Sequence, residues 1–131
     1  MATQLSMAKQ GEITPQMRQV AADEKKTPEE IRDLVARGEA VIPYNRHRNF
    51  HAVGIGRGLR TKINANIGAS SLRSLEEEEL RKLQVAVDAG AHSVMDLSTG
   101  GNLEEIRRII LEKSPVMVGT VPVYDLATQG K

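Results

Sequence analysis

Residues 60–67, with the sequence Arg-Thr-Lys-Ile-Asn-Ala-Asn-Ile, decide the fold class of this chain. Polar and apolar side chains alternate along the segment, which places two sets of side chains on opposite faces of an extended strand. The polar set is Lys62, Asn64 and Asn66, and the apolar set is Ile63, Ala65 and Ile67. We therefore predict a β-strand with one buried face and one face of amides and an ammonium group. Such a polar face is suited to an oxygen-rich ligand, so this segment is the first candidate for a binding site.

Two further strands are predicted at residues 93–98, SVMDLS, and 117–124, MVGTVPVY. The helix before residues 93–98 follows Ser74-Leu75-Glu76-Glu77, which has the pattern of a capping box, and Gly90 ends it. The next helix has Asn102 as its capping residue. The order strand, helix, strand, helix, strand predicts an α/β fold with a parallel sheet and right-handed crossovers.

The polar face of the first strand bears on the architecture of this sheet. Central strands of an open doubly wound sheet are apolar on both faces, whereas a (β/α)8 barrel gathers polar side chains at its C-terminal mouth. A complete barrel needs about 250 residues, and this chain has 131. Either the sheet is open and small, or the chain is a piece of something larger.

The N-terminal part of the chain carries helix signals but almost no strand signal. Thr14-Pro15 and Thr27-Pro28-Glu29-Glu30 each place a capping threonine before a proline, which predicts helices near residues 14–24 and 28–37. Residues 39–58 contain a proline and three glycines and predict an extended loop.

We accordingly divide the chain into two parts. Residues 1–53 form a leader of helices and loop, and residues 54–131 hold three strands and two helices.

Composition excludes several classes of function. The net charge is +1, which argues against a dedicated nucleic-acid binder and against a polybasic membrane-surface protein. Aromatic residues make up only 2% of the chain, so base-stacking platforms are scarce. There is no cysteine, which excludes a disulfide framework and an Fe–S site within these residues. No apolar run reaches the roughly 18 residues of a membrane span, and we expect a soluble, cytoplasmic protein.

Four other motifs each have a functional and a structural interpretation. The glycines of residues 54–58 precede a strand rather than a helix, which favours a turn over a phosphate loop. Residues 96–102 lead from a strand into a helix and are either an anion site or a loop with a capping asparagine. His47 and His51 have no cysteine or acidic cluster beside them, which favours structural roles. Residues 76–79 are four glutamates, which we interpret as a solvated first helical turn.

Five segments, in order along the chain, resemble one family. Residues 62–68, KINANIG, residues 94–102, VMDLSTGGN, and residues 114–124, SPVMVGTVPVY, are similar to the N-terminal part of the ThiC family of phosphomethylpyrimidine synthases. The opening residues 3–17, TQLSMAKQGEITPQM, and residues 41–45, VIPYN, also resemble that family. The resemblance covers nearly the whole chain.

The resemblance implies a fold and an activity. The fold would be the N-terminal part of a (β/α)8 TIM-like barrel, about three parallel βα units, preceded by a small helical and loop leader. The family rearranges aminoimidazole ribotide into hydroxymethylpyrimidine phosphate for thiamine biosynthesis, and it is a carbon–carbon lyase of the radical S-adenosylmethionine type. Its substrate-binding asparagine, methionine and tyrosine map onto Asn66, Met95 and Tyr124. No catalytic residue or metal ligand maps onto this chain.

The chain also departs from the family. The 4Fe-4S cluster of the family is held by C-terminal cysteines, which this chain lacks, and zinc is possible in the full-length proteins. We therefore expect this fragment to be inactive by itself. The resemblance implies a homodimer for the complete enzyme. Residues 42–49 and Ala69 differ from the usual pattern, which leaves open a fragment of the related hydroxybenzimidazole synthase of anaerobic cobalamin biosynthesis. A non-catalytic binding or assembly module is the third alternative.

Overall fold

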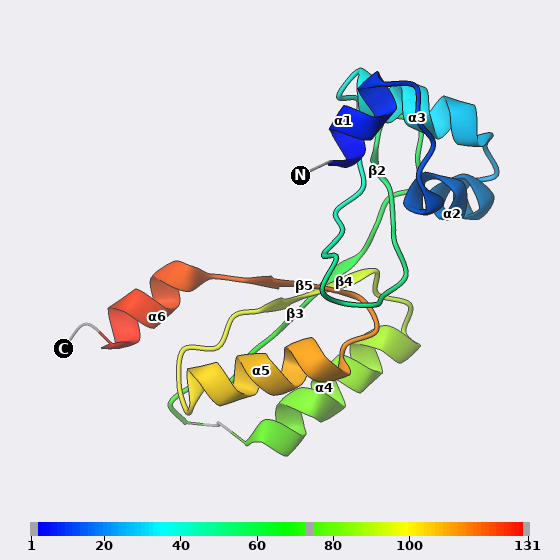
Figure 1. Ribbon diagram of the computed structural model, residues 1–131. Coiled ribbons are helices and arrows are strands. Elements are labelled where there is room, and N and C mark those ends of the chain that lie inside the picture. Colours follow the sequence, from blue (N-terminus) through cyan, green and yellow to red (C-terminus); the bar gives the residue numbers. More distant parts are fainter. Residues whose placement is uncertain (1–2, 73–74, 130–131) are drawn as a thin grey trace. The chain divides into compact units, whose positions relative to one another are not determined.

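The computed structural model of the chain describes residues 3–72 and 75–129 (Figure 1). The chain forms two compact units, Met1–Thr61 and Lys62–Lys131. Among the described residues, no helix is both long enough and apolar enough to cross a membrane.

The first unit contains three helices, α1 (Gln4–Lys9), α2 (Pro15–Glu24) and α3 (Pro28–Ala36). The two predicted helices are confirmed as α2 and α3, whereas α1 was not predicted. Threonine caps begin all three helices, and the hydroxyl of Thr27 accepts a hydrogen bond from the backbone N–H of Glu30.

Aliphatic side chains from the three helices and from the segments that follow them make the core of this unit. Because the unit contains few aromatic rings, its core depends on close packing of small and branched residues. The buried members are Ala8, Met17, Val20, Ala21, Ile31, Val35, Ala40, Ile42 and Ala52.

Two short strands lie within the stretch that the sequence predicted to be an extended loop. β1 (Ala40–Val41) pairs antiparallel with β2 (Ile55–Gly56). A Cβ atom on Gly56 would lie 2.5 Å from the Cα of Ala40, so only glycine allows this approach. Gly56 also accepts a hydrogen bond from the N–H of Leu59. The glycine-rich segment therefore forms a strand pair and a turn, which confirms the prediction of a turn.

The capping box of α3 should make stability depend on pH. The backbone N–H of Thr27 donates to the Glu30 carboxylate at 2.7 Å and lowers the pKa of that carboxyl, and Lys26 acts in the same direction. A lowered folded-state pKa means that ionised Glu30 stabilises the fold above its unfolded-state pKa. That contribution is lost as pH falls through the folded-state pKa. We expect Glu30→Gln to flatten the fall in melting temperature between about pH 7 and pH 3, because glutamine does not titrate. Melting curves with the same pH dependence in both proteins would contradict this.

The second unit alternates strands and helices. In chain order its elements are β3 (Asn64–Ile67), α4 (Glu76–Asp88), β4 (Ser93–Asp96), α5 (Leu103–Lys113), β5 (Met117–Thr120) and α6 (Pro122–Gln129). The three strands form one sheet in the order β3-β4-β5, and both pairs are parallel. The prediction of an α/β fold with a parallel sheet is confirmed.

The two faces of this sheet differ in what they contact. Helices α4 and α5 lie side by side on one face (Figure 1). Their apolar residues pack there against the inward set of strand residues, which includes Ala65, Ile67, Val94 and Val118. Because neighbouring residues on a strand point to opposite sides, the other face carries Asn64, Asn66, Ser93, Met95, Met117 and Gly119.

Three predicted boundaries in this unit are wrong. The second strand ends at Asp96 rather than at residue 98. The first strand begins at Asn64 rather than at residue 60. The third strand ends at Thr120 because α6 begins at Pro122, where the proline occupies the first helical position. The capping role predicted for Ser74 lies outside the described residues. Helix α4 itself follows Leu75, which makes no side-chain capping hydrogen bond.

Candidate functional site

One row of residues crosses the sheet of the second unit near the carboxyl ends of its strands. Asn66 is the register partner of Met95, and Met95 is the register partner of Gly119. All three therefore belong to the face that α4 and α5 do not cover. The structure thus brings together two of the three residues predicted to bind substrate, Asn66 and Met95, and adds Gly119, which the sequence did not indicate.

Asn66 is held by its neighbours on the same face. The amide nitrogen of Asn64 donates to Oδ1 of Asn66 at 3.1 Å, and the hydroxyl of Ser93 donates to Oδ1 of Asn64 at 2.7 Å. These bonds fix the amide oxygen of Asn66, and its side chain remains exposed. The amide N–H groups are then the donors that Asn66 offers to a ligand.

Met95 occupies the middle of the row. Its side chain is half-buried, and its Sδ and Cε atoms would each lie 2.8 Å from a Cβ atom placed on Gly119. The thioether therefore lies over the backbone of β5, in space that any larger residue at position 119 would occupy. The site consequently has a polarisable sulfur atom beside the amide of Asn66.

The loops after β3 and β4 are joined to each other. The N–H of Leu97 donates to the carbonyl of Ile67 and that of Thr99 to the carbonyl of Ala69, both at 2.8 Å. The Ser98 hydroxyl accepts from the N–H of Ala69 at 3.0 Å. These bonds continue the pairing of the two strands past their ends and fix the backbone around the row.

A buried carboxylate completes this connection. Asp96 is 4% exposed and accepts hydrogen bonds from the N–H of Ser98 at 3.0 Å and from its hydroxyl at 2.5 Å. The Ser98 hydroxyl therefore donates to Asp96 and accepts from the N–H of Ala69. The side chain of Asn102 accepts from the N–H of Glu105 and so caps α5. These contacts confirm the interpretation of residues 96–102 as a loop with a capping asparagine.

The interpretation of residues 76–79 as a solvated turn is wrong for Glu79. Glu79 is 1% exposed, and its Oε1 accepts from the ammonium group of Lys82 at 2.5 Å. The same ammonium group donates to the carbonyl of Gly68 at 3.0 Å. Glu79 thus helps Lys82 hold the backbone just after β3. No sequence signal separates Glu79 from its three neighbours except its place on the inner face of α4.

Tyr124 lies in the first turn of α6, beyond the end of β5, rather than in a strand. It is 38% exposed, and its N–H donates to the carbonyl of Val121. The next residue, Asp125, accepts from the guanidinium of Arg107 on α5, with contacts of 2.7 and 2.6 Å. This ion pair links the start of α6 to α5, so Tyr124 is placed by a helix. Within residues 3–72 and 75–129, no hydrogen bond joins Tyr124 to Asn66 or Met95.

The two histidines predicted to be structural have protein partners in the first unit. Nδ1 of His51 lies 2.6 Å from the amide nitrogen of Gln19, and Nε2 lies 2.5 Å from Oδ2 of Asp23. His47 accepts from Nε of Arg46 at 3.2 Å. Among residues 3–72 and 75–129, no three His, Cys, Asp or Glu side chains form a group that could hold a metal ion.

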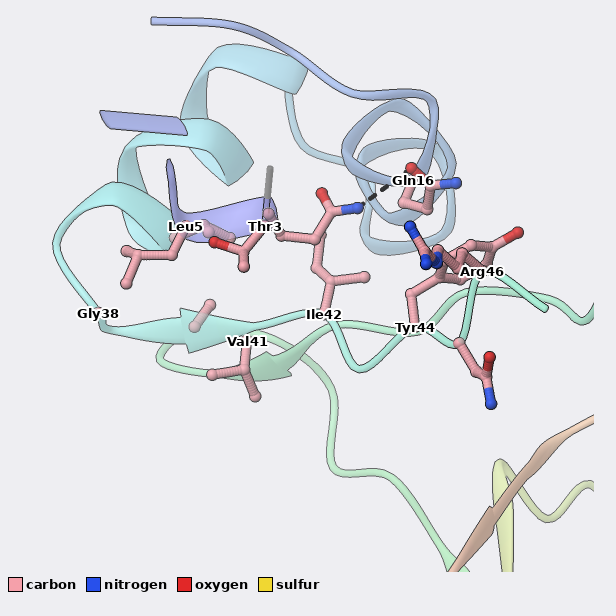
Figure 2. Close-up of a pocket in the computed structure, with 12 residues that line it drawn as sticks. Thr3, Leu5, Gln16, Gly38, Val41, Ile42, Tyr44 and Arg46 are labelled. Atoms are coloured by element: carbon pink, nitrogen blue, oxygen red, sulfur yellow. Dashed lines mark hydrogen bonds between the residues drawn. The ribbon is translucent and has the colours of Figure 1, made fainter. Parts of the chain in front are cut away.

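One cavity lies in the first unit, and another includes Asn66 of the row in its lining. Figure 2 shows the first, a space of about 1090 Å³ in the first unit, lined mainly by apolar residues such as Leu5, Val41 and Tyr44 and bordered by the hydrogen bond between Gln4 and Gln16. The second, about 520 Å³, runs along β3 and α4. Its lining residues are Ala65, Asn66, Ile67, Glu78, Arg81, Lys82, Val85, Ala86 and Ala89. The sequence did not predict either cavity, because both depend on tertiary packing.

Comparison of the sequence with known proteins identifies the family of this chain. The model of the radical SAM ThiC family matches residues 3–131. The chain belongs to that family. It is 58% identical over 128 residues to the phosphomethylpyrimidine synthase of Carboxydothermus hydrogenoformans, a match that covers 97% of this chain and 30% of that protein. It is 54% identical over 127 residues to the synthase of Thermodesulfovibrio yellowstonii and 49% identical over 130 residues to that of Halobacterium salinarum, matches that cover 97% and 98% of this chain and 30% and 27% of those proteins.

The chain therefore spans about 30% of the length of these relatives. The radical SAM family name implies S-adenosylmethionine and an iron–sulfur cluster in the whole protein. Thiolates are the usual ligands of such clusters, and this ThiC-family chain contains no cysteine. The residues of this chain thus do not fit a cluster, whereas the row of Asn66 and Met95 suits an uncharged part of a small polar molecule.

Proposed function

We propose that this chain supplies part of the substrate site of a phosphomethylpyrimidine synthase, which rearranges aminoimidazole ribotide into hydroxymethylpyrimidine phosphate in the cytoplasm. The observation that carries the proposal is the register of Asn66 beside Met95 on the face of a parallel sheet that α4 and α5 do not cover. The relatives, whose sequences match almost all of this chain, are named phosphomethylpyrimidine synthases, which supports the proposed product.

Each proposed residue has a role that its chemistry allows. Asn66 donates its amide N–H groups to an oxygen or ring nitrogen of the ribotide, because its amide oxygen already accepts from Asn64. Met95 packs its thioether against the flat imidazole ring, a contact that sulfur makes favourably. Tyr124 offers its hydroxyl from the first turn of α6, where it is partly exposed.

The larger architecture is part of the same proposal. In the described residues, β3 and β5 each pair on one side only, and unpaired strand edges seek partners. We infer that further strands of the synthase pair with them to form a (β/α)8 barrel, which would carry Asn66 and Met95 near the C-terminal mouth of its strands. The cluster and S-adenosylmethionine are then held by other parts of the synthase, as a zinc ion would be, and the complete enzyme is a homodimer of the lyase class.

A non-catalytic binding module is the second candidate. The sequence contains no cysteine to hold a cluster for radical chemistry, whereas the row of Asn66 and Met95 could bind a ligand without a cluster. Turnover separates the two candidates: supplying the missing part of the synthase should produce hydroxymethylpyrimidine phosphate only under the first.

Calorimetry with aminoimidazole ribotide tests the site in this chain. We expect weak binding by the wild type and about tenfold weaker binding by Asn66→Ala, because a donor to the ligand is lost. Gln84→Ala is the control, since it removes another amide of the second unit, one that is exposed and donates to Asp88 on α4. No heat with the wild type, or an equal loss in both variants, would overturn the assignment of Asn66. Product formed by the isolated chain would contradict the proposed division of labour.

A further inference from the structure

The backbone conformation at position 119 does not require a glycine. Several glycines of the second unit have a positive φ, including Gly68 and Gly90, but Gly119 is not among them. It lies inside β5, where a glycine weakens a strand and often marks a close approach by another group. The group that approaches is the thioether of Met95, with both Sδ and Cε 2.8 Å from the position of a Cβ atom.

The position of that thioether controls the space beside Asn66. Because Met95 stands between Asn66 and Gly119 in the row, a thioether that lies over β5 leans away from Asn66. Asn66 remains exposed, as a ligand-binding amide must be. A methyl group at position 119 would fill the space over β5. The flexible end of Met95 would then move while the backbone stays in place, since the side chain has three rotatable bonds.

We propose that Gly119 is a positioning residue that sets the width of the substrate site, because its lack of a side chain leaves room for the Met95 thioether over β5. The proposal rests on the proposed function for the identity of the ligand, a flat heteroaromatic ring attached to a ribose phosphate. It goes further because it assigns the space available to the ring to a residue that does not touch the ligand itself. Glycine at position 119 leaves room for a ring next to Asn66, whereas alanine would place the methyl group of Met95 there.

The position of Met95 can be measured without a ligand. The chain has five methionines, so carbon-13 labelling of their methyl groups gives few signals, and Met95→Leu assigns that of Met95. We expect Gly119→Ala to shift the Met95 methyl resonance and to leave that of Met17, in the core of the first unit, unchanged. Gly90→Ala is the control, because its added methyl group meets no atom within 4 Å. An unmoved Met95 resonance in folded Gly119→Ala protein would overturn the proposal.

Binding separates positioning from a general structural defect. We expect Gly119→Ala to weaken binding of aminoimidazole ribotide about tenfold, because the contact between sulfur and ring is lost and the site becomes narrower. In a Met95→Ala background the same change should have little effect, because no thioether remains to be displaced. Equal losses in the two backgrounds would show that Gly119 does not act through Met95. If the wild type bound no ribotide, the proposed function would fail for this chain, while the methyl resonance would still decide whether Gly119 places Met95.

Discussion

Replacing Gly68 with alanine is expected to lower the free energy of unfolding of the second unit by about 3 kcal/mol, because strain and overpacking act together. Gly68 has a φ of 152°, and a Cβ atom there would lie 2.7 Å from the carbonyl carbon of Leu97 and 2.8 Å from the nitrogen of Ser98. Both contacts are with backbone, which cannot rotate away as a side chain can. Urea unfolding followed by circular dichroism measures the loss.

The matched control is Gly90→Ala. Gly90 also has a positive φ, of 87°, but its added Cβ atom would meet nothing within 4 Å, so only a conformational cost of about 1 kcal/mol is expected. Hydrogen exchange locates the damage: Gly68→Ala should expose the amides of Leu97 and Thr99, which donate to the carbonyls of Ile67 and Ala69. Equal losses of stability in the two variants, with those amides still protected, would contradict the role assigned to the contact.

Much of the fold could be predicted because local signals agree with tertiary packing. Threonine before proline marks the starts of α2 and α3, and the structure shows those hydroxyls accepting backbone N–H groups. Alternation along residues 60–67 gives the correct faces of β3, since Ala65 and Ile67 pack against α4 and α5. The third member of the predicted apolar set, Ile63, precedes the strand and is exposed. Strands separated by helices require parallel pairing, which the structure confirms.

The prediction fails where two signals compete. Residues 121–124, with the sequence VPVY, contain β-branched and aromatic residues and were predicted to continue the third strand. Pro122 instead begins α6, because proline lacks a donor for the sheet but suits the first turn of a helix. Tyr124 is consequently a helical residue. Helix α1 was missed because it has only six residues, too few for a periodic pattern.

The site was predictable only in part. Asn66 and Met95 could be placed on one face from the period of two along a strand, and parallel pairing brings them into register. Gly119 could not be found that way, because its role depends on the rotamer of a neighbour. Glu79 was misinterpreted, since four equal residues hide which one faces inward. The part played by Asp96 likewise depends on contacts between two loops.

Replacing Asp96 with alanine is expected to cost about 3 kcal/mol of stability, because buried donors to a charged group lose their acceptor. Asp96 is 4% exposed and Ser98 is 6% exposed, so water reaches the vacated N–H and hydroxyl poorly. The control is Asp88→Ala, which removes an exposed carboxylate whose partner is the amide of Gln84. That change should alter stability by about 0.5 kcal/mol or less.

A double-mutant cycle tests whether Asp96 acts through Ser98. The Ser98 hydroxyl donates to Asp96 and accepts from the N–H of Ala69, so the three residues form one connection between the ends of β4 and β3. We expect Asp96→Ala and Ser98→Ala together to cost clearly less than the sum of the two single changes. Strict additivity would mean that the two residues stabilise the sheet separately. Non-additivity would show that a buried network beneath the sheet holds the strand ends whose opposite face carries Asn66 and Met95.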